Sequence, residues 1–261
     1  MTSFGPLELL ETTDAVTGGG AGLMDADVVT GSDAATGTDA ATGSGAADIS
    51  TPPTENHLIN RMLLDVFQKG LIRGSAHLPF DPEKAYAYVE HPTEGWRVYL
   101  RSCIFLHPAN EPFHPQRFLV VKKTGARPTS AAWEPPKGQM ERKELRGSIL
   151  DALTQNVLRE TEEESHITDV QRVHHTGLVF QSQETNYPPH HFFQYHIFQG
   201  FITPQQIEQS FSTFEWMKEH KAAVKRWRRD RKEKDAAAWF SPRETRVNPR
   251  WCPDIVALYL R

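Results

Sequence analysis

The chain of 261 residues has few cysteines and no long hydrophobic run. Its two cysteines, Cys103 and Cys252, form no CxxC pair, which argues against a disulfide framework or a structural zinc site. No stretch approaches the ~18 consecutive apolar residues of a membrane-spanning helix. The N-terminus also lacks the basic start of a signal peptide. These absences predict a soluble intracellular protein, in the cytoplasm or the nucleus.

Basic residues are missing from the first 55 positions, which contain nine Asp and Glu residues. From Thr30 this segment repeats Gly, Ala, Thr, Ser and Asp. Such a composition has too few apolar side chains to offset the entropy lost on ordering, so residues 1–55 are predicted to form a disordered acidic tail. The remaining residues carry all 29 Lys and Arg and the other 24 acids, which leaves a net charge of +5.

Apolar periodicity places the other elements. Residues at helical spacing from Leu58 to Phe67, followed by Gly70 and Gly74, predict an amphipathic N-terminal helix over 56–74. Its polar face has few Lys or Arg residues, so it is expected to pack on the domain and not to contact a membrane. Strands are predicted over 96–108, 117–123, 173–183, 191–202 and 236–241, and a last helix over DIVALYLR. Residues 56–261 are therefore expected to form one domain.

The stretch WEPPKGQMERKELRGSILDALTQNVLRETEEESHI, residues 133–167, contains a cluster of acids. Glu160, Glu163 and Glu164 are spaced i, i+3 and i+4, so they share one face of a helix, where their charges repel. A hard divalent cation stabilises such a cluster, and magnesium, or manganese in its place, prefers oxygen ligands. Arg159 adjoins the cluster and could orient it. An isolated run of this kind is more often a solvated acidic face, so the flanking residues decide between the two interpretations.

The WEPPKG segment is one of these flanks. Two prolines stiffen the chain before Gly138, and glycine permits a close approach of the backbone to a ligand. A rigid loop is thus predicted to meet the acidic helix.

Taken together, these residues resemble the Nudix box, G-x5-E-x7-R-E-U-x-E-E-x-G-U with U aliphatic. The matching positions are Gly138, Glu144, Arg159, Glu160, Glu163, Glu164 and Ile167. PPKG with LRETEEE is also similar to the asymmetric diadenosine tetraphosphate hydrolases of that superfamily.

The resemblance covers about residues 95–260 and implies an α/β/α sandwich around a mixed sheet. It also implies magnesium-dependent hydrolysis of a phosphoanhydride bond in a nucleoside polyphosphate, most like a dinucleoside tetraphosphate. Glu160, Glu163, Glu164 and the backbone of Gly138 would hold the metal ion, with Arg159 as a further catalytic residue. Lys137 would contact phosphate.

The sequence departs from this box at three places, of which Thr161 in place of an aliphatic residue is the mildest. Seven extra residues separate Glu144 from Arg159, so either Glu144 or Asp151 fills the upstream acidic position. We expect the extra residues to lengthen the loop around 142–148, because Gly147 disfavours a helix interior. His166 stands where the box has glycine, and we expect a shifted helix end, because histidine adopts positive φ only at a cost.

The general base is also open at this stage. Glu160 is one candidate, and Glu184, which lies outside the box, is another.

A basic segment over about 213–235 is predicted to be a helical insertion. Its Lys and Arg residues between 218 and 234, interleaved with Trp216 and Trp227, could bind RNA phosphates. The alternative functions are therefore mRNA cap or diphosphoinositol polyphosphate hydrolysis, or a non-catalytic RNA- or nucleotide-binding role. Acids within the segment equally fit a solvated helix with internal ion pairs. The sequence does not decide the exact substrate or the oligomeric state.

Overall fold

The computed structural model describes residues 62–79 and 81–261. The predicted acidic tail, residues 1–55, lies outside this part, as do residues 56–61 of the predicted N-terminal helix.

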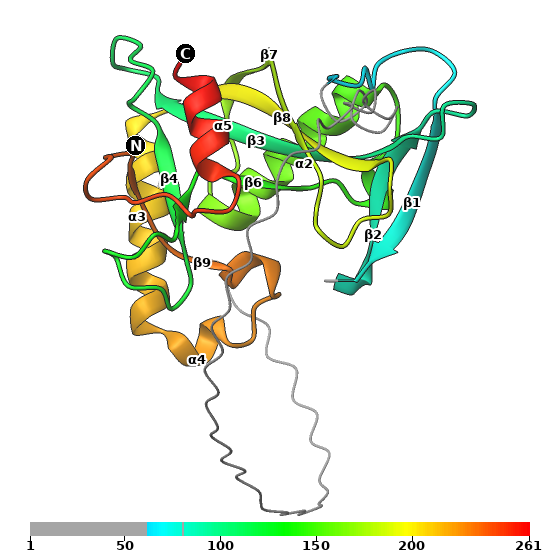
Figure 1. The fold of residues 1–261 in the computed structure, drawn as a ribbon. Coiled ribbons are helices and arrows are strands. Elements are labelled where there is room, and N and C mark those ends of the chain that lie inside the picture. Colours follow the sequence, from blue (N-terminus) through cyan, green and yellow to red (C-terminus); the bar gives the residue numbers. More distant parts are fainter. Residues whose placement is uncertain (1–61, 80) are drawn as a thin grey trace, which may run out of the picture. The chain divides into compact units, whose positions relative to one another are not determined.

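A mixed six-stranded sheet forms the centre of the described part (Figure 1). Five strands follow the order β1-β2-β3-β8-β7, and β6 also pairs with β3. The β3–β8 pair is parallel and the other pairs are antiparallel. The bounds are β1 (Ile72–Leu78), β2 (Asp81–Glu90), β3 (Arg97–Pro108), β6 (Lys137–Gln139), β7 (Gln171–Ser182) and β8 (His191–Ile202).

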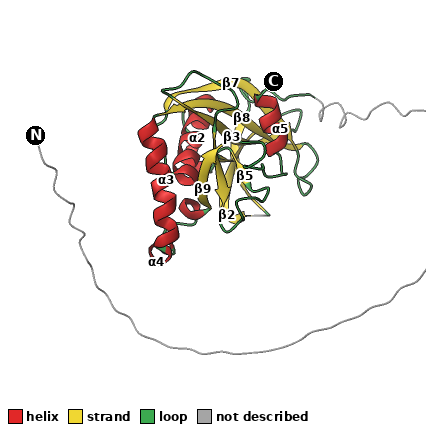
Figure 2. Cartoon of the chain, turned by 90° about the vertical axis from the view of Figure 1, so that its left-hand side faces the viewer, coloured by secondary structure: helices red, strands yellow, loops and turns green. Residues whose placement is uncertain are grey.

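Strand β3 is buried on both faces because its alternate side chains enter two different cores. Leu100 and Ile104 pack in one core with side chains of α2 (Ile149–Ser165). Tyr99 and Phe105 pack in the other core with side chains of α5 (Cys252–Tyr259). Figure 2 shows the strands between these two helices. The predicted α/β/α sandwich around a mixed sheet is confirmed.

A smaller antiparallel sheet has the strand order β5-β4-β9. Its strands are β4 (Leu119–Lys123), β5 (Trp133–Glu134) and β9 (Lys234–Trp239). Helix α3 (Pro204–Glu219) packs beside β9. Three short helices complete the described part: η1 (Arg142–Glu144), α4 (Lys221–Val224) and η2 (Asp230–Lys232). None of the helices within 62–79 and 81–261 is long and apolar enough to cross a membrane.

The five predicted strands and the C-terminal helix are confirmed within a few residues as β3, β4, β7, β8, β9 and α5. The predicted helix over 56–74 is wrong wherever it is described. Residues 63–65 belong to no helix or strand, residues 66 and 67 lie in a turn, and β1 begins at Ile72. Leu64 and Val66 are buried while Leu63 and Phe67 are exposed.

Side chains of the main sheet hold the segment around Leu64 in place. Gln181 Oε1 accepts a hydrogen bond from Leu64 N at 3.0 Å, and Gln194 Nε2 donates to Leu64 O at 2.7 Å. The backbone groups at Leu64 are therefore satisfied by tertiary contacts instead of by helical bonds.

The predicted helical insertion over 213–235 has different bounds. Its long helix begins earlier, at Pro204, because Thr203 forms a capping box and proline suits the first turn. The helix ends at Glu219, and only the short α4 and η2 follow. Lys234 lies in β9, so the basic run is divided between three short elements and a strand.

Candidate active site

The predicted site residues meet in one cavity of about 230 Å³, which we call the carboxylate cavity. Its walls come from β6, α2, β2 and the segment that joins η2 to β9. All six residues predicted for the site line it: Lys137, Gly138, Arg159, Glu160, Glu163 and Glu164.

The start of α2 sets the direction of the acidic side chains. Ser148 is the N-cap: its Oγ accepts a hydrogen bond from Asp151 N at 3.0 Å, and Asp151 completes a capping box. The seven extra residues of the box therefore lie in a longer loop before the helix, as predicted, with Gly147 at a φ of 71°. The helix then runs unbroken to Ser165 and presents Glu160, Glu163 and Glu164 to the cavity.

Glu144, and not Asp151, belongs to the site. Glu144 is buried and accepts hydrogen bonds from Arg159 Nε and from Glu141 N, both at 2.7 Å. Asn156 Nδ2 donates a third at 3.3 Å. Asp151 is exposed and is used in capping α2. The lengthened loop thus returns Glu144 to the acidic helix face.

Arg159 joins three carboxylates. Its guanidinium donates to Glu144, to Glu160 Oε1 at 2.6 Å and to Glu163. Burial acts to lower the pKa of Arg159, but the neighbouring carboxylates outweigh it and raise that pKa. Arg159 therefore stays charged and orients the cluster.

Glu160 lies directly against the backbone of Gly138. A Cβ atom added at Gly138 would be 1.8 Å from Cδ of Glu160, so this position admits only glycine while the carboxyl stays where it is. Burial raises the pKa of Glu160 to about 8, although Arg159 acts in the opposite direction. The environment of Glu160 thus favours binding of a positive charge, either a proton or a metal ion.

Glu164 belongs to a second buried network. It accepts a hydrogen bond from Lys137 N at 2.9 Å and forms an ion pair with Lys234 Nζ at 2.8 Å. Glu134 pairs with the same Lys234 and with Lys137 Nζ, the latter at 3.0 Å. Burial acts to lower the pKa of Lys137, but Glu134 outweighs it, so that pKa is raised and the ammonium stays charged.

Glu134 and Lys234 are site residues that the sequence analysis missed. Glu134 stands within WEPPKG, and it could have been found from that motif. Lys234 was read as one member of a basic helix, and its pairing across 100 residues has no local signal.

The carboxylates fit a hard divalent cation through the chemistry of their donors. Oxygen ligands gather on one helix face beside a glycine backbone, and Glu160 already favours a bound positive charge. Within residues 62–79 and 81–261, however, no three acidic, histidine or cysteine side chains are arranged as a complete metal site. Arg159 lies between Glu160 and Glu163, so metal binding requires its guanidinium to shift.

A second cavity of about 530 Å³, the cationic cavity, adjoins the first. The two share Glu134, Lys137, Gln139, Tyr195, Glu233 and Lys234 as lining residues. Six cations line the cationic cavity: Arg101, Lys123, Lys137, Arg229, Lys234 and Arg250. Three acids face them, so this cavity is positive overall.

Glu184 lies in the cationic cavity and not in the carboxylate cavity. Its buried carboxylate pairs with Arg101 at 3.1 Å and with Arg250 at 2.6 Å. Its position outside the carboxylate cavity makes Glu184 a weak candidate for a general base.

His166 ends α2 in the left-handed conformation, with φ at 60°. The expected shift of the helix end is therefore wrong, because histidine itself adopts the conformation that the box gives to glycine. Its ring packs against Phe214 and Trp227, with centroids 5.0 and 5.8 Å away. Burial lowers the pKa of His166 to about 4, so the packed ring is neutral at pH 7.

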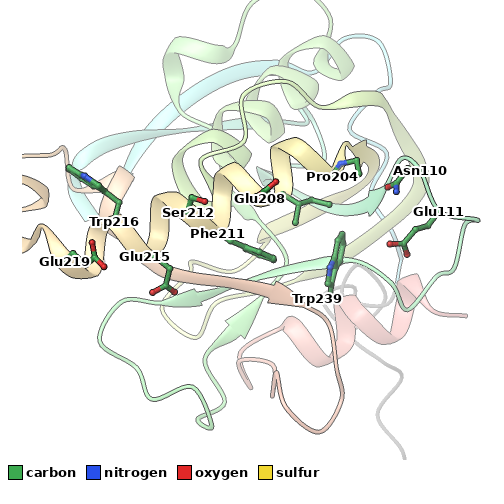
Figure 3. Close-up of a pocket in the computed structure, with 11 residues that line it drawn as sticks. Asn110, Glu111, Pro204, Glu208, Phe211, Ser212, Glu215, Trp216, Glu219 and Trp239 are labelled. Atoms are coloured by element: carbon green, nitrogen blue, oxygen red, sulfur yellow. The ribbon is translucent and has the colours of Figure 1, made fainter. Parts of the chain in front are cut away.

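Another cavity, of about 640 Å³, lies between α3 and Trp239 and contains none of the predicted site residues (Figure 3). Its apolar wall includes Phe211 and Trp239, and its charged residues are all acidic: Glu111, Glu208, Glu215 and Glu219. A phosphate-bearing ligand would be repelled there.

The family model of the NUDIX domain matches residues 103–240, more than half of the chain. Among curated proteins, none matches significantly.

Several solved structures are similar at low identity. A NUDIX hydrolase from Nitrosomonas europaea is 14% identical, with 62% of this chain and 88% of that chain covered and a TM-score of 0.37. A mutT/nudix family protein from Listeria innocua is 16% identical, with 49% and 94% covered and a TM-score of 0.28. The Ap4A hydrolase of C. elegans is 18% identical, with 40% and 67% covered and a TM-score of 0.25.

Replacing Gly138 with alanine tests the contact with Glu160. The new Cβ would overlap the carboxyl, so Glu160 must move, and hydrolytic activity should fall about a hundredfold. Gly95→Ala is the control, because Gly95 has open space around it, although its positive φ strains alanine there. We expect Gly95→Ala to lower the melting temperature without loss of kcat/KM. A fully active Gly138→Ala variant would show that the position of Glu160 is unimportant.

Glu144→Gln and Asp151→Asn together test which acid completes the box. Glu144→Gln removes a charged partner of Arg159, and we expect kcat/KM to fall at least about tenfold. Asp151→Asn changes only an exposed helix cap, and its activity should equal that of the wild type. Steady-state rates of both purified variants test this expectation. Loss of activity in Asp151→Asn but not in Glu144→Gln would assign the upstream acidic position of the box to Asp151.

Proposed function

Because the chain belongs to the NUDIX domain family, we propose that this pyrophosphohydrolase cuts a phosphoanhydride bond in a nucleoside polyphosphate, most like a dinucleoside tetraphosphate. One observation carries the proposal: the carboxylate cavity and the cationic cavity adjoin each other and share lining residues.

The charges of the two cavities suit the two requirements of such a reaction, which are to bind a metal ion and to bind the phosphates of the substrate. The carboxylate cavity is lined by eight acids and four cations, and the cationic cavity by six cations and three acids. A polyphosphate in the cationic cavity would be neutralised there and would reach the carboxylates at the shared wall. Lys137 lines both cavities, and we assign it the phosphate group next to the scissile bond.

We assign the metal ion, Mg²⁺ or Mn²⁺, to Glu160, Glu163, Glu164 and the carbonyl of Gly138. Such an ion, when bound, polarises the phosphate and lowers the pKa of a water molecule. Glu164 is already fixed by Lys234 and by Lys137 N, so it supplies a preorganised oxygen. Arg159 keeps Glu160 and Glu163 on the same side of α2 before the ion enters.

Glu160 is our candidate for the group that takes a proton from the attacking water. It lines the carboxylate cavity beside the backbone of Gly138, on the helix face where the attacking water would be bound. Glu184 is less suited, because it lies outside that cavity, where it pairs with Arg101 and Arg250.

A panel of substrates tests this function with magnesium present. The wild type should release mononucleotides from diadenosine tetraphosphate faster than products from capped RNA, ADP-ribose or a diphosphoinositol. Glu163→Gln removes an assigned ligand, and we expect its kcat to fall at least about a hundredfold. Glu162→Gln is the matched control, because Glu162 lies on the same helix but outside the cavity.

Three outcomes would contradict the proposal. Faster cleavage of capped RNA or of a diphosphoinositol would select that alternative substrate. A fully active Glu163→Gln variant would remove Glu163 from the metal site. A wild type that is inert on the whole panel but binds RNA would select the non-catalytic function.

A further inference from the structure

A fourth cavity, of about 650 Å³, lies where α3, α4 and η2 meet the loop after β4. We call it the α4 basin, and five cations line it: Lys218, Lys221, Lys225, Arg229 and Lys232. It lies within the basic segment that the sequence analysis identified, and the reaction described above does not use it.

The positive charge of the α4 basin is poorly neutralised. Only two acids line it, Glu233 and Asp235, and Asp235 is already bound by Lys122 and by Gly125 N. In the part of the chain that the structure describes, Lys221, Lys225 and Lys232 form no ion pair. Converging cations without carboxylate partners favour an anionic ligand.

The wall of the basin is partly apolar. Met217, which is buried, and Val224 line it among the methylene stems of the lysines. An apolar wall with cations at its rim suits a nucleobase that carries a phosphate, and the volume is that of a small-molecule site.

The basin adjoins two of the cavities already described. Thr124, Arg229 and Glu233 line both the α4 basin and the cationic cavity. Glu233 also lines the carboxylate cavity. The three cavities therefore adjoin one another.

We propose that the α4 basin binds the second nucleotide of the substrate, the one at the far end of the polyphosphate from the carboxylate cavity. This inference rests on the proposed hydrolysis of a dinucleoside polyphosphate. The chain of phosphates lies along the cationic cavity and passes Arg229 before the second nucleotide enters the basin.

The aromatic side chains favour a single nucleotide over an RNA strand. Trp216 and Trp227 stack on each other, with ring centroids 5.6 Å apart, and Trp216 also stacks on His220. Neither tryptophan lines the basin. An RNA strand needs a series of open stacking surfaces, and these rings are already occupied by each other.

The test compares two substrates that differ by one nucleoside, diadenosine tetraphosphate and adenosine 5′-tetraphosphate. In the wild type the second adenosine should lower KM. The double variant Lys221→Ala/Lys225→Ala should raise KM for diadenosine tetraphosphate about tenfold, by loss of charged contacts, and should remove the difference between the substrates. Lys69→Ala/Arg243→Ala is the control, since both residues are exposed and line none of these cavities.

Val224→Asn provides a second variant that alters the apolar wall without changing the charge. It should also raise KM for diadenosine tetraphosphate more than KM for adenosine 5′-tetraphosphate. Circular dichroism and melting temperatures show whether each variant is folded.

The outcomes separate this inference from the proposed function. If the wild type cleaves diadenosine tetraphosphate and neither variant alters the KM ratio, the basin proposal is overturned while the function stands. If the wild type cleaves neither substrate, the function fails, and calorimetric titration with diadenosine tetraphosphate then tests the basin directly. Weaker binding by the double variant would support the basin, and equal binding would overturn it. Inhibition by 5′-phosphorylated RNA that becomes stronger with RNA length beyond two nucleotides would overturn the proposal, because it would show that the basin binds an RNA strand and not a single nucleotide.

Discussion

The guanidinium of Arg159 determines how the acidic site is arranged. Glu144, Glu160 and Glu163 come from a loop and from one helix face, and all three would repel one another in a partly buried space. Arg159 binds each of them, and thereby ties the long loop before α2 to the helix itself. Removal of a partner from such a buried group is costly, because the remaining charges are left uncompensated. The seven extra residues of the box are tolerated for this reason: only Glu144 has to return to Arg159.

The network of Glu134, Lys137, Glu164 and Lys234 joins the two sheets at the same place. Glu134 and Lys234 belong to β5 and β9 of the small sheet, Lys137 to β6 of the large sheet, and Glu164 to α2. Each charge in this buried group has an opposite partner, as burial requires. Three of these residues, Glu134, Lys137 and Lys234, line both the carboxylate cavity and the cationic cavity. The ion pairs of the network therefore help to shape both cavities.

The sequence predicts β3, β8 and the acidic helix better than it predicts β2. β3 and β8 are recognisable because they are long segments rich in aromatic and aliphatic residues, most of which are buried. β2 was missed because it begins with DPEK and is only partly buried. Spacing alone brings Glu160, Glu163 and Glu164 together, since helical geometry is local. The partners of Glu164 could not be predicted, because the Lys234–Glu134 pair depends on how β9 packs near β5.

His166 stands where the box has glycine, and its contacts with the segment between β8 and β9 explain how a histidine is accommodated there. A histidine at positive φ costs about 1 kcal/mol relative to glycine, but its ring packs on Phe214 of α3 and on Trp227. The ion pairs that link the same segment to the domain, Lys84–Asp230 and Arg231–Glu162, are partly exposed, and such pairs contribute little on their own. Packing on His166 is therefore the stronger link between the helix that carries the acidic cluster and the segment that forms the α4 basin. The contacts of the His166 ring with Phe214 and Trp227 thus offset the conformational cost at the end of α2. They also hold the segment between β8 and β9 beside the carboxylate cavity, which Asp230 and Glu233 of that segment help to line.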